Sequence, residues 1–358
     1  MDDLRVATTE EEREGIYRFR YRVFAQHLGR SDLHGLDHAR QTLSDPLDPR
    51  SQHFYYGEPC APVASVTFSP LDAAEVSAGL SAFLDLDRLR QAVAVERMGL
   101  VNWLLVDPAQ SNAVLVHGLL AAAYEQLLRD GFELLLTFCR PGLVSFYESL
   151  GLEQYTYVGD LEGIGLRCPL MLVMRDGARL KALRSPLLRI LLRNGGREEA
   201  GETRLLLEPI VDMFQARQIL VNDELWIESG ITFVERPLPR LFDGIPEDSI
   251  RQVMKMASVI TCQAGEVITR EGETSDDMFL IVSGSFRAER SGHEDVRLLG
   301  QGDLFGEVEH LSGRPRAESV AATTQGHVAA LKAERLFQWM QRYPEAGVRV
   351  AVNLSRLL

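Results

Sequence analysis

The sequence predicts an α+β protein with two folded parts, a mixed helix-and-strand part first and a β-roll with helices after it. The chain has 358 residues, which is more than one hydrophobic core usually serves. Helical and strand patterns alternate over residues 1–178, whereas β-branched runs and glycines alternate over 241–358. We therefore expect a first domain at 1–178, a mostly helical connector at 179–240 and a C-terminal domain at 241–358.

Hydrophobic periodicity places the elements of the first domain. It predicts helices at 10–28, 114–129 and 143–150, and strands at 53–56, 63–68, 97–106 and 132–139. Such mixing is typical of an α/β or α+β domain.

The C-terminal domain has a repeating rhythm of short strands and turns. A helix start at Pro246 precedes the β-branched runs, and glycines interrupt these runs at 265, 272, 284, 292, 302 and 306. Tight turns between short strands favour glycine, so the spacing predicts a β-roll or barrel.

The composition excludes several classes of protein. The net charge of −13 disfavours DNA as a partner, because a phosphate backbone rewards clustered Lys and Arg. Four scattered cysteines without CxxC spacing argue against a disulfide framework and a zinc site, so we expect no metal. The acidic N-terminus differs from a secretory signal, and no apolar run is long enough to cross a bilayer. We expect a cytoplasmic protein.

Residues 302–320, GDLFGEVEHLSGRPRAESV, have the pattern of a phosphate-binding segment. Phe305-Gly306-Glu307 is followed nine residues later by Arg316, which resembles the cassette of cyclic-nucleotide-binding domains such as the catabolite activator protein and protein kinase A regulatory subunits. Backbone N–H groups and one guanidinium suit a phosphodiester, and a carboxylate suits a ribose hydroxyl. The resemblance implies that Arg316 binds the phosphate and Glu307 the ribose of a cyclic nucleotide, with cyclic AMP as the first expectation. The binding residues that it implies are Phe305, Gly306, Glu307, Arg316, Ala317 and Ser319.

Two carboxylates depart from this family pattern. Glu309 and Glu318 stand where relatives usually have small residues, and a carboxylate beside a phosphate repels it. The alternative interpretation of Glu307 and Arg316 is an ion pair on a surface loop. The domain's output is expected upstream, since no helix-turn-helix pattern follows it.

Residues 131–155, GFELLLTFCRPGLVSFYESLGLEQY, join an apolar strand to a helix and a glycine-centred turn. This segment resembles the last helix of GNAT acyltransferases, which implies a mixed sheet with flanking helices. In that superfamily a tyrosine of this run protonates the leaving thiolate, so the resemblance assigns that role to Tyr147. The alternative is a tyrosine of the hydrophobic core.

The superfamily binds its acyl donor where a strand turns into a helix through a Q/RxxGxG/A pattern, with backbone N–H groups around a pyrophosphate. Here Ala113 and Leu115 replace the glycines, which suits an acyl carrier protein held through its pantetheine arm better than coenzyme A. The donor-binding residues implied are Val106, Gln110, Ser111, Asn112, Ala113, Val114 and Leu115.

The segments IYRFRYRVFAQHLGR at 16–30 and DPLDPRSQHFYY at 45–56 resemble bacterial N-acyl amino acid synthases and acyl-homoserine lactone synthases, which join a fatty acyl group to an amine. The acceptor residues that this implies are Arg20, Phe24, Asp45, Asp48 and His53. A structural ion-pair network of Arg20, Arg22 and Asp48 is the alternative. Thr67 ends a run, Ala64-Ser-Val-Thr, that stands where relatives have a basic residue.

Acyl transfer needs a base, since only a neutral amine is nucleophilic. Glu96 is the candidate, because it stands where the lactone synthases have a glutamate. An ion pair between Glu96 and Arg97 is the alternative.

The connector contains a basic segment, 179–197, with six Lys or Arg and no acid. It has three interpretations: a docking surface for the acidic acyl carrier protein, a membrane-surface helix with a leucine face, or leucines that pack internally beneath paired arginines. The leucines of that face are 180, 183, 187, 188, 191 and 192.

Together these patterns predict an acyltransferase that moves a fatty acyl group from acyl carrier protein or acyl-CoA to a small amine, under control of a nucleotide. A nucleotide-controlled protein lysine acetyltransferase and a non-catalytic sensor or scaffold are the alternatives.

Overall fold

The computed structural model describes residues 4–27, 30, 33–71, 76–110, 113–161, 165–211, 240–273, 277–293, 296–306 and 314–357. Their contacts form two compact units. The first unit comprises Met1–Phe138, Tyr147–Thr156 and Pro169–Val211, and the second comprises Cys139–Phe146, Tyr157–Cys168 and Asp212–Leu358. The basic part of the connector therefore folds with the first unit.

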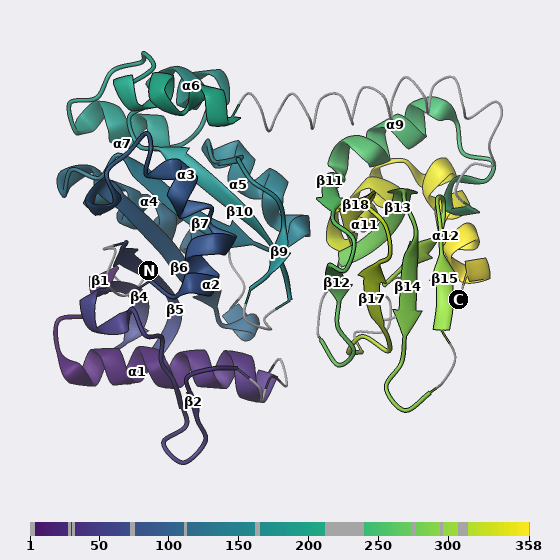
Figure 1. Ribbon diagram of the computed structural model, residues 1–358, viewed down its shortest axis with the longest axis horizontal. Coiled ribbons are helices and arrows are strands. Elements are labelled where there is room, and N and C mark those ends of the chain that lie inside the picture. The colour runs from purple at the N-terminus through teal and green to yellow at the C-terminus, as the bar shows by residue number, and fades with distance from the viewer. Residues whose placement is uncertain are drawn as a thin grey trace. The chain divides into compact units, whose positions relative to one another are not determined.

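An eight-stranded mixed sheet organises the N-terminal part (Figure 1). Its order is β1 (Arg5–Val6), β4 (Gln52–Glu58), β5 (Ala61–Pro70), β6 (Met98–Val106), β7 (Leu134–Cys139), β10 (Leu166–Val173) and β8 (Glu153–Gln154), with β9 (Gly159–Asp160) beside β10. The β1–β4, β4–β5, β5–β6 and β10–β8 pairs are antiparallel, whereas β6 and β7 are parallel. The mixed sheet with flanking helices is confirmed.

Helices lie on both faces of this sheet. Adjacent residues of a strand point to opposite faces, so two neighbouring tyrosines of β4 show which helix covers which face. Tyr55 donates a hydrogen bond from its hydroxyl to Glu12 of α1 (Glu10–Tyr21) at 2.7 Å. The hydroxyl of the next residue, Tyr56, lies 2.3 Å from where a Cβ on Gly118 of α4 (Ala113–Arg129) would be. Thus α1 and α4 cover opposite faces.

The remaining helices of the N-terminal part are short. The structure continues α1 as a π-helical turn at Arg22–His27 and forms a two-stranded sheet from β2 (Leu36–Asp37) and β3 (Thr42–Leu43). The short helices include α2 (Ala78–Phe83), α3 (Leu86–Leu89), α5 (Val144–Leu150), α6 (Gly177–Ala182) and α7 (Leu187–Arg193).

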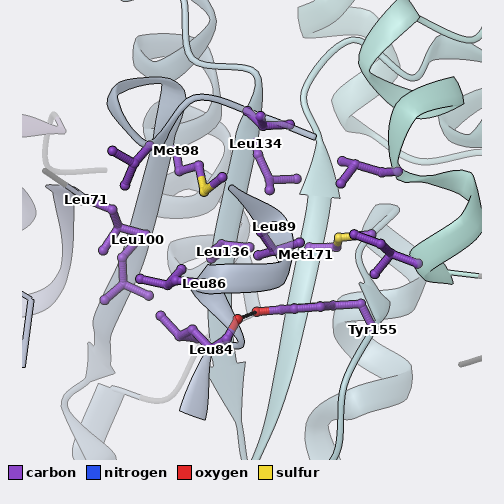
Figure 2. Packing of buried hydrophobic residues seen from close by; sticks show 14 of the residues in the cluster. Leu71, Leu84, Leu86, Leu89, Met98, Leu100, Leu134, Leu136, Tyr155 and Met171 are labelled. Carbon is purple, nitrogen blue, oxygen red and sulfur yellow. Dashed lines mark hydrogen bonds between the residues drawn. The ribbon is translucent and has the colours of Figure 1, made fainter. Parts of the chain in front are cut away.

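A hydrophobic cluster fills the sheet face that carries α2 and α3 (Figure 2). Met98 and Leu100 of β6 pack there with Leu134 and Leu136 of β7, all buried, and each fully buried side chain of this kind contributes about 1.5–3 kcal/mol. Tyr155 closes one side, where its hydroxyl donates to the carbonyl of Leu84 at 2.7 Å (Figure 2). The helical residues 202–211 complete the cluster with Leu207, Ile210 and Val211.

The C-terminal part is a β-roll of two four-stranded antiparallel sheets, as predicted (Figure 1). One sheet has the order β11 (Ser258–Cys262), β18 (Gly326–Lys332), β13 (Asp277–Ser283) and β16 (Leu304–Phe305). The other has the order β12 (Val267–Thr269), β17 (Ser319–Ala322), β14 (Phe286–Glu289) and β15 (Val296–Leu299). The six glycines of the sequence rhythm all have φ between 76° and 91°, a region open to glycine at little steric cost.

Three helices close one side of the roll: α9 (Glu247–Met256), α11 (Ala333–Arg342) and α12 (Pro344–Leu357). Their apolar faces share a core in which Trp339 also donates to Gln252 at 3.0 Å. Asn353 of α12 is buried and donates to the carbonyls of Leu241 and Asp243, at 3.0 and 2.9 Å. The last helix is thereby held to the start of the roll. In the part of the chain that is described, no helix combines the length and the apolarity needed to span a bilayer.

Candidate functional site

A buried ion pair lies between α1 and the sheet. Arg20 donates to both carboxylate oxygens of Asp48, at 2.7 and 2.9 Å, and to the hydroxyl of Thr67 at 2.7 Å. Arg20 is 0% exposed and Asp48 3%. A planar fork facing a carboxylate in a dry environment is a strong and well-oriented contact, so the pair holds α1 to the turn at Asp48–Arg50, and the hydrogen bond to Thr67 holds it to β5.

Thr67 joins this ion pair to His53. The hydroxyl of Thr67 and Nδ1 of His53 are 3.0 Å apart, and Asn102 lies opposite Thr67 on the neighbouring strand. Burial first, and then the charge of Arg20, lower the pKa of His53 to about 3, so the ring is neutral. Within the described residues, Arg20 Nε, His53 Nε2, Ser65 Oγ and Asn102 Oδ1 have no hydrogen-bond partner, which leaves the cluster with unused donors and acceptors.

A bulge in β6 turns Trp103 toward the same cluster. Two residues of β6 stand against Val66 alone, because Ser65 pairs with Leu105 and Thr67 with Asn102. Trp103 has a φ of 51° there and donates from its indole N–H to Asp45 at 2.9 Å. Its ring lies 4.9 Å from the guanidinium carbon of Arg20 and 5.4 Å from the ring of Phe24, edge to face.

The structure thus brings together all five acceptor residues expected from the sequence, namely Arg20, Phe24, Asp45, Asp48 and His53. Sequence analysis missed Trp103 and Asn102, and it noted Thr67 only as the residue replacing a basic side chain. The available signal was polar residues at alternate positions of β5, Ser65, Thr67 and Ser69, all buried on one face of the strand.

The parallel strands β6 and β7 separate toward their carboxyl ends. Within the described residues of the two strands, backbone pairing ends at Leu100 and Leu136, although β6 continues to Val106. Just beyond, the hydroxyl of Thr137 donates to the carbonyl of Val101 at 2.7 Å. Carboxyl ends of parallel strands that diverge are a usual place for ligands in such sheets.

The turn after β6 is held by Asp107. This carboxylate accepts from the backbone N–H of Ala109 at 3.0 Å, and Arg22 lies 3.4 Å from it. Val106 is half-buried and Gln110 exposed, and α4 then begins at Ala113 with Val114 exposed and Leu115 half-buried. Ser111 and Asn112 lie outside the described residues. The expected donor-binding residues that are described therefore gather at the carboxyl end of β6.

The two expected catalytic residues lie at different ends of the sheet. Tyr147 is 6% exposed and belongs to α5, which follows the carboxyl end of β7. Glu96 is exposed and precedes β6, whose length from Met98 to Val106 is roughly 26 Å. The structure therefore does not bring Glu96 to the carboxyl ends of the parallel pair. The alternative interpretation, an ion pair between Glu96 and Arg97, is wrong as well, because Arg97 pairs with Glu133.

A second arrangement, in the β-roll, surrounds Arg316. Its guanidinium is buried, donates to the carbonyl of Gly306 at 2.8 Å and also donates to the carbonyl of Asp277. Gly306 has a φ of 81°, and a Cβ there would lie 2.1 Å from Arg316 Nη1. A side chain at this position would therefore have a strained backbone and would displace the guanidinium of Arg316. Phe305 of β16, the residue before Gly306, stacks on Phe279 with ring centroids 5.0 Å apart. This contact holds the backbone that leads into Gly306.

The backbone of Arg316 is fixed as well. Its N–H donates to the carbonyl of Glu273 and its carbonyl accepts from Gly272, both at 2.8 Å. The hydroxyl of Ser319 accepts from the backbone N–H of Glu271 at 2.9 Å. Ala317, which follows Arg316 in the sequence, is exposed. The two Nη atoms of Arg316 that donate to these carbonyls are also the atoms through which a guanidinium binds a phosphate or another anion. Glu307 and Glu309 lie outside the described residues.

Comparison with known families identifies this second arrangement. Residues 259–343 match the family described as the cyclic nucleotide-binding domain. The C-terminal part of this chain is a cyclic-nucleotide-binding domain. The acyltransferase identity expected for residues 1–178 stays a prediction.

Relatives of the cyclic-nucleotide-binding domain come from several kinds of protein. A CRP-like cAMP-activated global transcriptional regulator of Mycobacterium tuberculosis is 25% identical over 122 residues, which are 33% of this chain and 54% of the regulator. A cAMP-dependent protein kinase regulatory subunit of Pyricularia oryzae is 40% identical over 68 residues, 19% of this chain and 17% of the subunit. The chain thus spans about half the length of the first curated relatives that it matches.

Among solved structures, the catabolite activator protein of Thermus thermophilus is 28% identical, with 33% of this chain and 55% of that protein covered and a TM-score of 0.30.

Glu318 of the cyclic-nucleotide-binding domain is held by an arginine. Arg297 of β15 donates to its carboxylate at 2.8 Å, with both side chains partly exposed. The repulsion of a phosphate expected from Glu318 is therefore reduced, because a cation already neutralises the carboxylate.

Glu318→Gln is expected to raise the affinity for a cyclic nucleotide less than about fivefold, since an exposed, paired and screened charge has a weak effect. Titration calorimetry with cyclic AMP measures it, and Arg297→Gln, which leaves Glu318 unpaired, is expected to lower the affinity by a similar factor. A gain of tenfold or more in Glu318→Gln would show that the ion pair does not neutralise this carboxylate.

Proposed function

We propose that this chain is an N-acyltransferase controlled by a cyclic nucleotide that binds its C-terminal domain. The enzyme moves a fatty acyl group from acyl carrier protein or acyl-CoA to the amine of an amino acid or a similar small acceptor. One observation carries the proposal furthest: β6 and β7 diverge at their carboxyl ends, where α5 carries Tyr147 and where the expected donor-binding turn begins.

The diverging strands suit a long and narrow donor. Beyond Leu100, β6 still pairs with β5, but its backbone pairing with β7 has ended. The edge of β6 that faces β7 therefore offers hydrogen-bonding groups along an extended path, as an exposed strand edge does to an added peptide. The amide-bearing arm of an acyl carrier protein or of coenzyme A has matching groups. Thr137, whose hydroxyl binds the carbonyl of Val101, lies where this path begins.

The chemistry requires one proton for the leaving group. The amine nitrogen attacks the thioester carbon, a tetrahedral intermediate forms, and the carbon–sulfur bond breaks to release a thiolate. Tyr147, on the helix after β7, is the residue proposed to give that thiolate its proton, and the phenolate so formed then takes up the proton that the nitrogen of the amine loses as the amide forms. Glu96 has no part in this proposal, because it lies at the other end of β6.

The acceptor is proposed to bind beside the bulge of β6. Trp103, Phe24 and Asp45 surround that point, and the buried Arg20–Asp48 pair holds α1 in place behind them. Asp45 is the carboxylate at this point that suits an ammonium group. The unused polar atoms of Ser65 and Asn102 add hydrogen-bonding capacity for a small polar acceptor.

Nucleotide control is supported by the domain match and by the first relative, which is named as cAMP-activated. The route proposed for the signal is the helical segment 202–211, which precedes the C-terminal domain in the sequence. Arg204 binds the buried Glu153 and lies 3.6 Å from Asp176, while Arg88 donates to the carbonyl of Ile210 at 2.8 Å. A change transmitted along this segment reaches the core directly beneath the paired halves of β6 and β7.

The donor test uses purified full-length chain with a labelled long-chain acyl carrier protein and a mixture of amino acids, in parallel with labelled acetyl-CoA and protein substrates. We expect acylated amino acids from the first reaction. Acetyl transfer to protein lysines with no product from the carrier would overturn the proposal in favour of a protein acetyltransferase. No product in either reaction would favour a non-catalytic sensor.

Tyr147→Phe is expected to lower the turnover number for acyl transfer by about 100-fold or more, with little change in KM for the donor, because only the leaving-group proton is lost. Tyr124→Phe is the matched control, since Tyr124 is a buried tyrosine of α4 that donates to the carbonyl of Met174. Its turnover should stay near the wild-type value. Equal turnover in the two variants would assign Tyr147 to the core instead.

A further inference from the structure

The outer surface of α6 and α7 concentrates positive charge in an acidic chain. Lys181, Arg184, Arg189, Arg193 and Arg197 are all exposed, and no acid occurs between Asp176 and Glu198. Arg179 is the exception: it turns inward, donates to the carbonyl of Gly151 at 2.8 Å and binds Glu153 at 3.2 Å. We call the five exposed cations the α6–α7 basic face.

The charges of this face are largely uncompensated. Lys181 binds Glu198 at 2.5 Å, but over the described ranges none of the four arginines has an ion pair. Their field is local, because salt screens charges beyond about 10 Å and the net charge of −13 is spread over the whole chain. An anionic partner at this face therefore interacts mainly with the arginines, and the net negative charge of the chain has little effect on it.

The structure limits how this segment can bind a membrane. Leu180, Leu187 and Leu191 of the expected leucine face are buried in the first unit together with Ile190, so these three leucines are not available for insertion into a bilayer. The internal packing of this face, the third interpretation of the basic segment, is confirmed for those residues. Any partner must bind the outward side.

Two leucines remain on the outward side, and each stands directly before an arginine. Leu183 is 42% exposed beside Arg184, and Leu192 is 41% exposed beside Arg193. At a lipid surface, such pairs place the apolar tip toward the acyl chains and the guanidinium among the phosphates. A continuous run of residues 177–197 without any acid also suits a uniformly anionic plane better than a protein surface of mixed charge.

We propose that the α6–α7 basic face docks this protein on an anionic membrane surface, through phosphate contacts of Arg184, Arg189, Arg193 and Arg197 and shallow contacts of Leu183 and Leu192. Binding is peripheral and reversible by salt. This docking is independent of the proposed reaction.

The test is co-sedimentation of the full chain with vesicles of equimolar phosphatidylglycerol and phosphatidylcholine, with pure phosphatidylcholine vesicles beside them. The wild-type chain should bind the anionic vesicles at low salt and dissociate at high salt. Combining Arg184→Gln, Arg189→Gln and Arg193→Gln should weaken binding at least roughly tenfold. Leu183→Ser with Leu192→Ser should weaken it severalfold and leave its salt dependence unchanged.

A charge-matched control combines Arg18→Gln, Arg129→Gln and Arg251→Gln, three exposed arginines on other helices. This control should bind vesicles within about twofold of the wild-type chain. The proposal is overturned if the wild-type chain does not bind the anionic vesicles, or if both triple variants lose binding equally. It is also overturned, in favour of an acidic protein partner, if the α6–α7 variant binds vesicles normally but uses acyl carrier protein poorly.

Discussion

Asp48→Ala is expected to destabilise the N-terminal sheet by about 3–5 kcal/mol, because it leaves the fully buried guanidinium of Arg20 without its carboxylate. The substitution also removes the carboxylate oxygen of Asp48 that accepts from the backbone N–H of Asp45 at 2.6 Å. Hydrogen exchange of the β4 and β5 amides under native conditions measures the free energy of unfolding of this region.

The matched control is Asp87→Asn, which breaks the Arg90–Asp87 ion pair of 3.0 Å, in which the aspartate is 91% exposed. It should cost less than about 1 kcal/mol. A double variant, Arg20→Met with Asp48→Leu, should recover most of the loss, since neither charge is then buried alone. Equal effects of Asp48→Ala and Asp87→Asn would contradict the assignment of the Arg20–Asp48 pair as the buried support of α1.

Arg316→Met is expected to weaken cyclic-nucleotide binding by roughly 100-fold or more. Hydrogen bonds to a charged group contribute about 1.5–3 kcal/mol each, and a guanidinium offers a phosphate two of them. Arg316→Lys keeps the positive charge but loses the two parallel N–H donors of the guanidinium. Its affinity for the nucleotide should therefore lie between those of the wild-type chain and Arg316→Met. Calorimetry with cyclic AMP and cyclic GMP measures the change.

Arg316 also binds the carbonyls of Gly306 and Asp277, so the fold of each variant needs its own readout. Protection of the β13 amides against hydrogen exchange supplies it. Arg297→Met, at a partly exposed position of β15 in the other sheet of the roll, is the control and should bind nucleotide within severalfold of wild type. Wild-type affinity in a folded Arg316→Met chain would remove Arg316 from the nucleotide site.

The sequence predicts the C-terminal domain well because its signals are local. A glycine at each tight turn and an arginine at a fixed distance from Phe305-Gly306 are short-range constraints, and the structure places all six glycines at positive φ. An ion-pair network that includes Arg20 and Asp48 is one of the alternatives that the sequence offers, but the burial of their contact depends on how α1 packs over β5.

Other features depend on tertiary packing and leave no local signal. The bulge at Trp103 is one extra residue in an otherwise regular apolar strand, so no spacing in the sequence reveals it. Glu96 lies just before β6 in the sequence, whereas the expected donor-binding residues lie after this strand. An extended strand places its two ends far apart, so closeness in sequence does not bring Glu96 to that site. The direction of the leucine face at 180–192 is set by the hydrophobic surface of the first unit, which periodicity alone cannot show.

The central claim is that a nucleotide bound at Arg316 controls acyl transfer in the N-terminal part. The most direct measurement compares the rate of acyl transfer from acyl carrier protein with and without saturating cyclic AMP, in the wild-type chain and in Arg316→Met. We expect the nucleotide to change the wild-type rate severalfold and to leave the variant's rate unchanged. Identical wild-type rates with and without the nucleotide, under conditions where calorimetry shows it bound, would show that the nucleotide does not control acyl transfer.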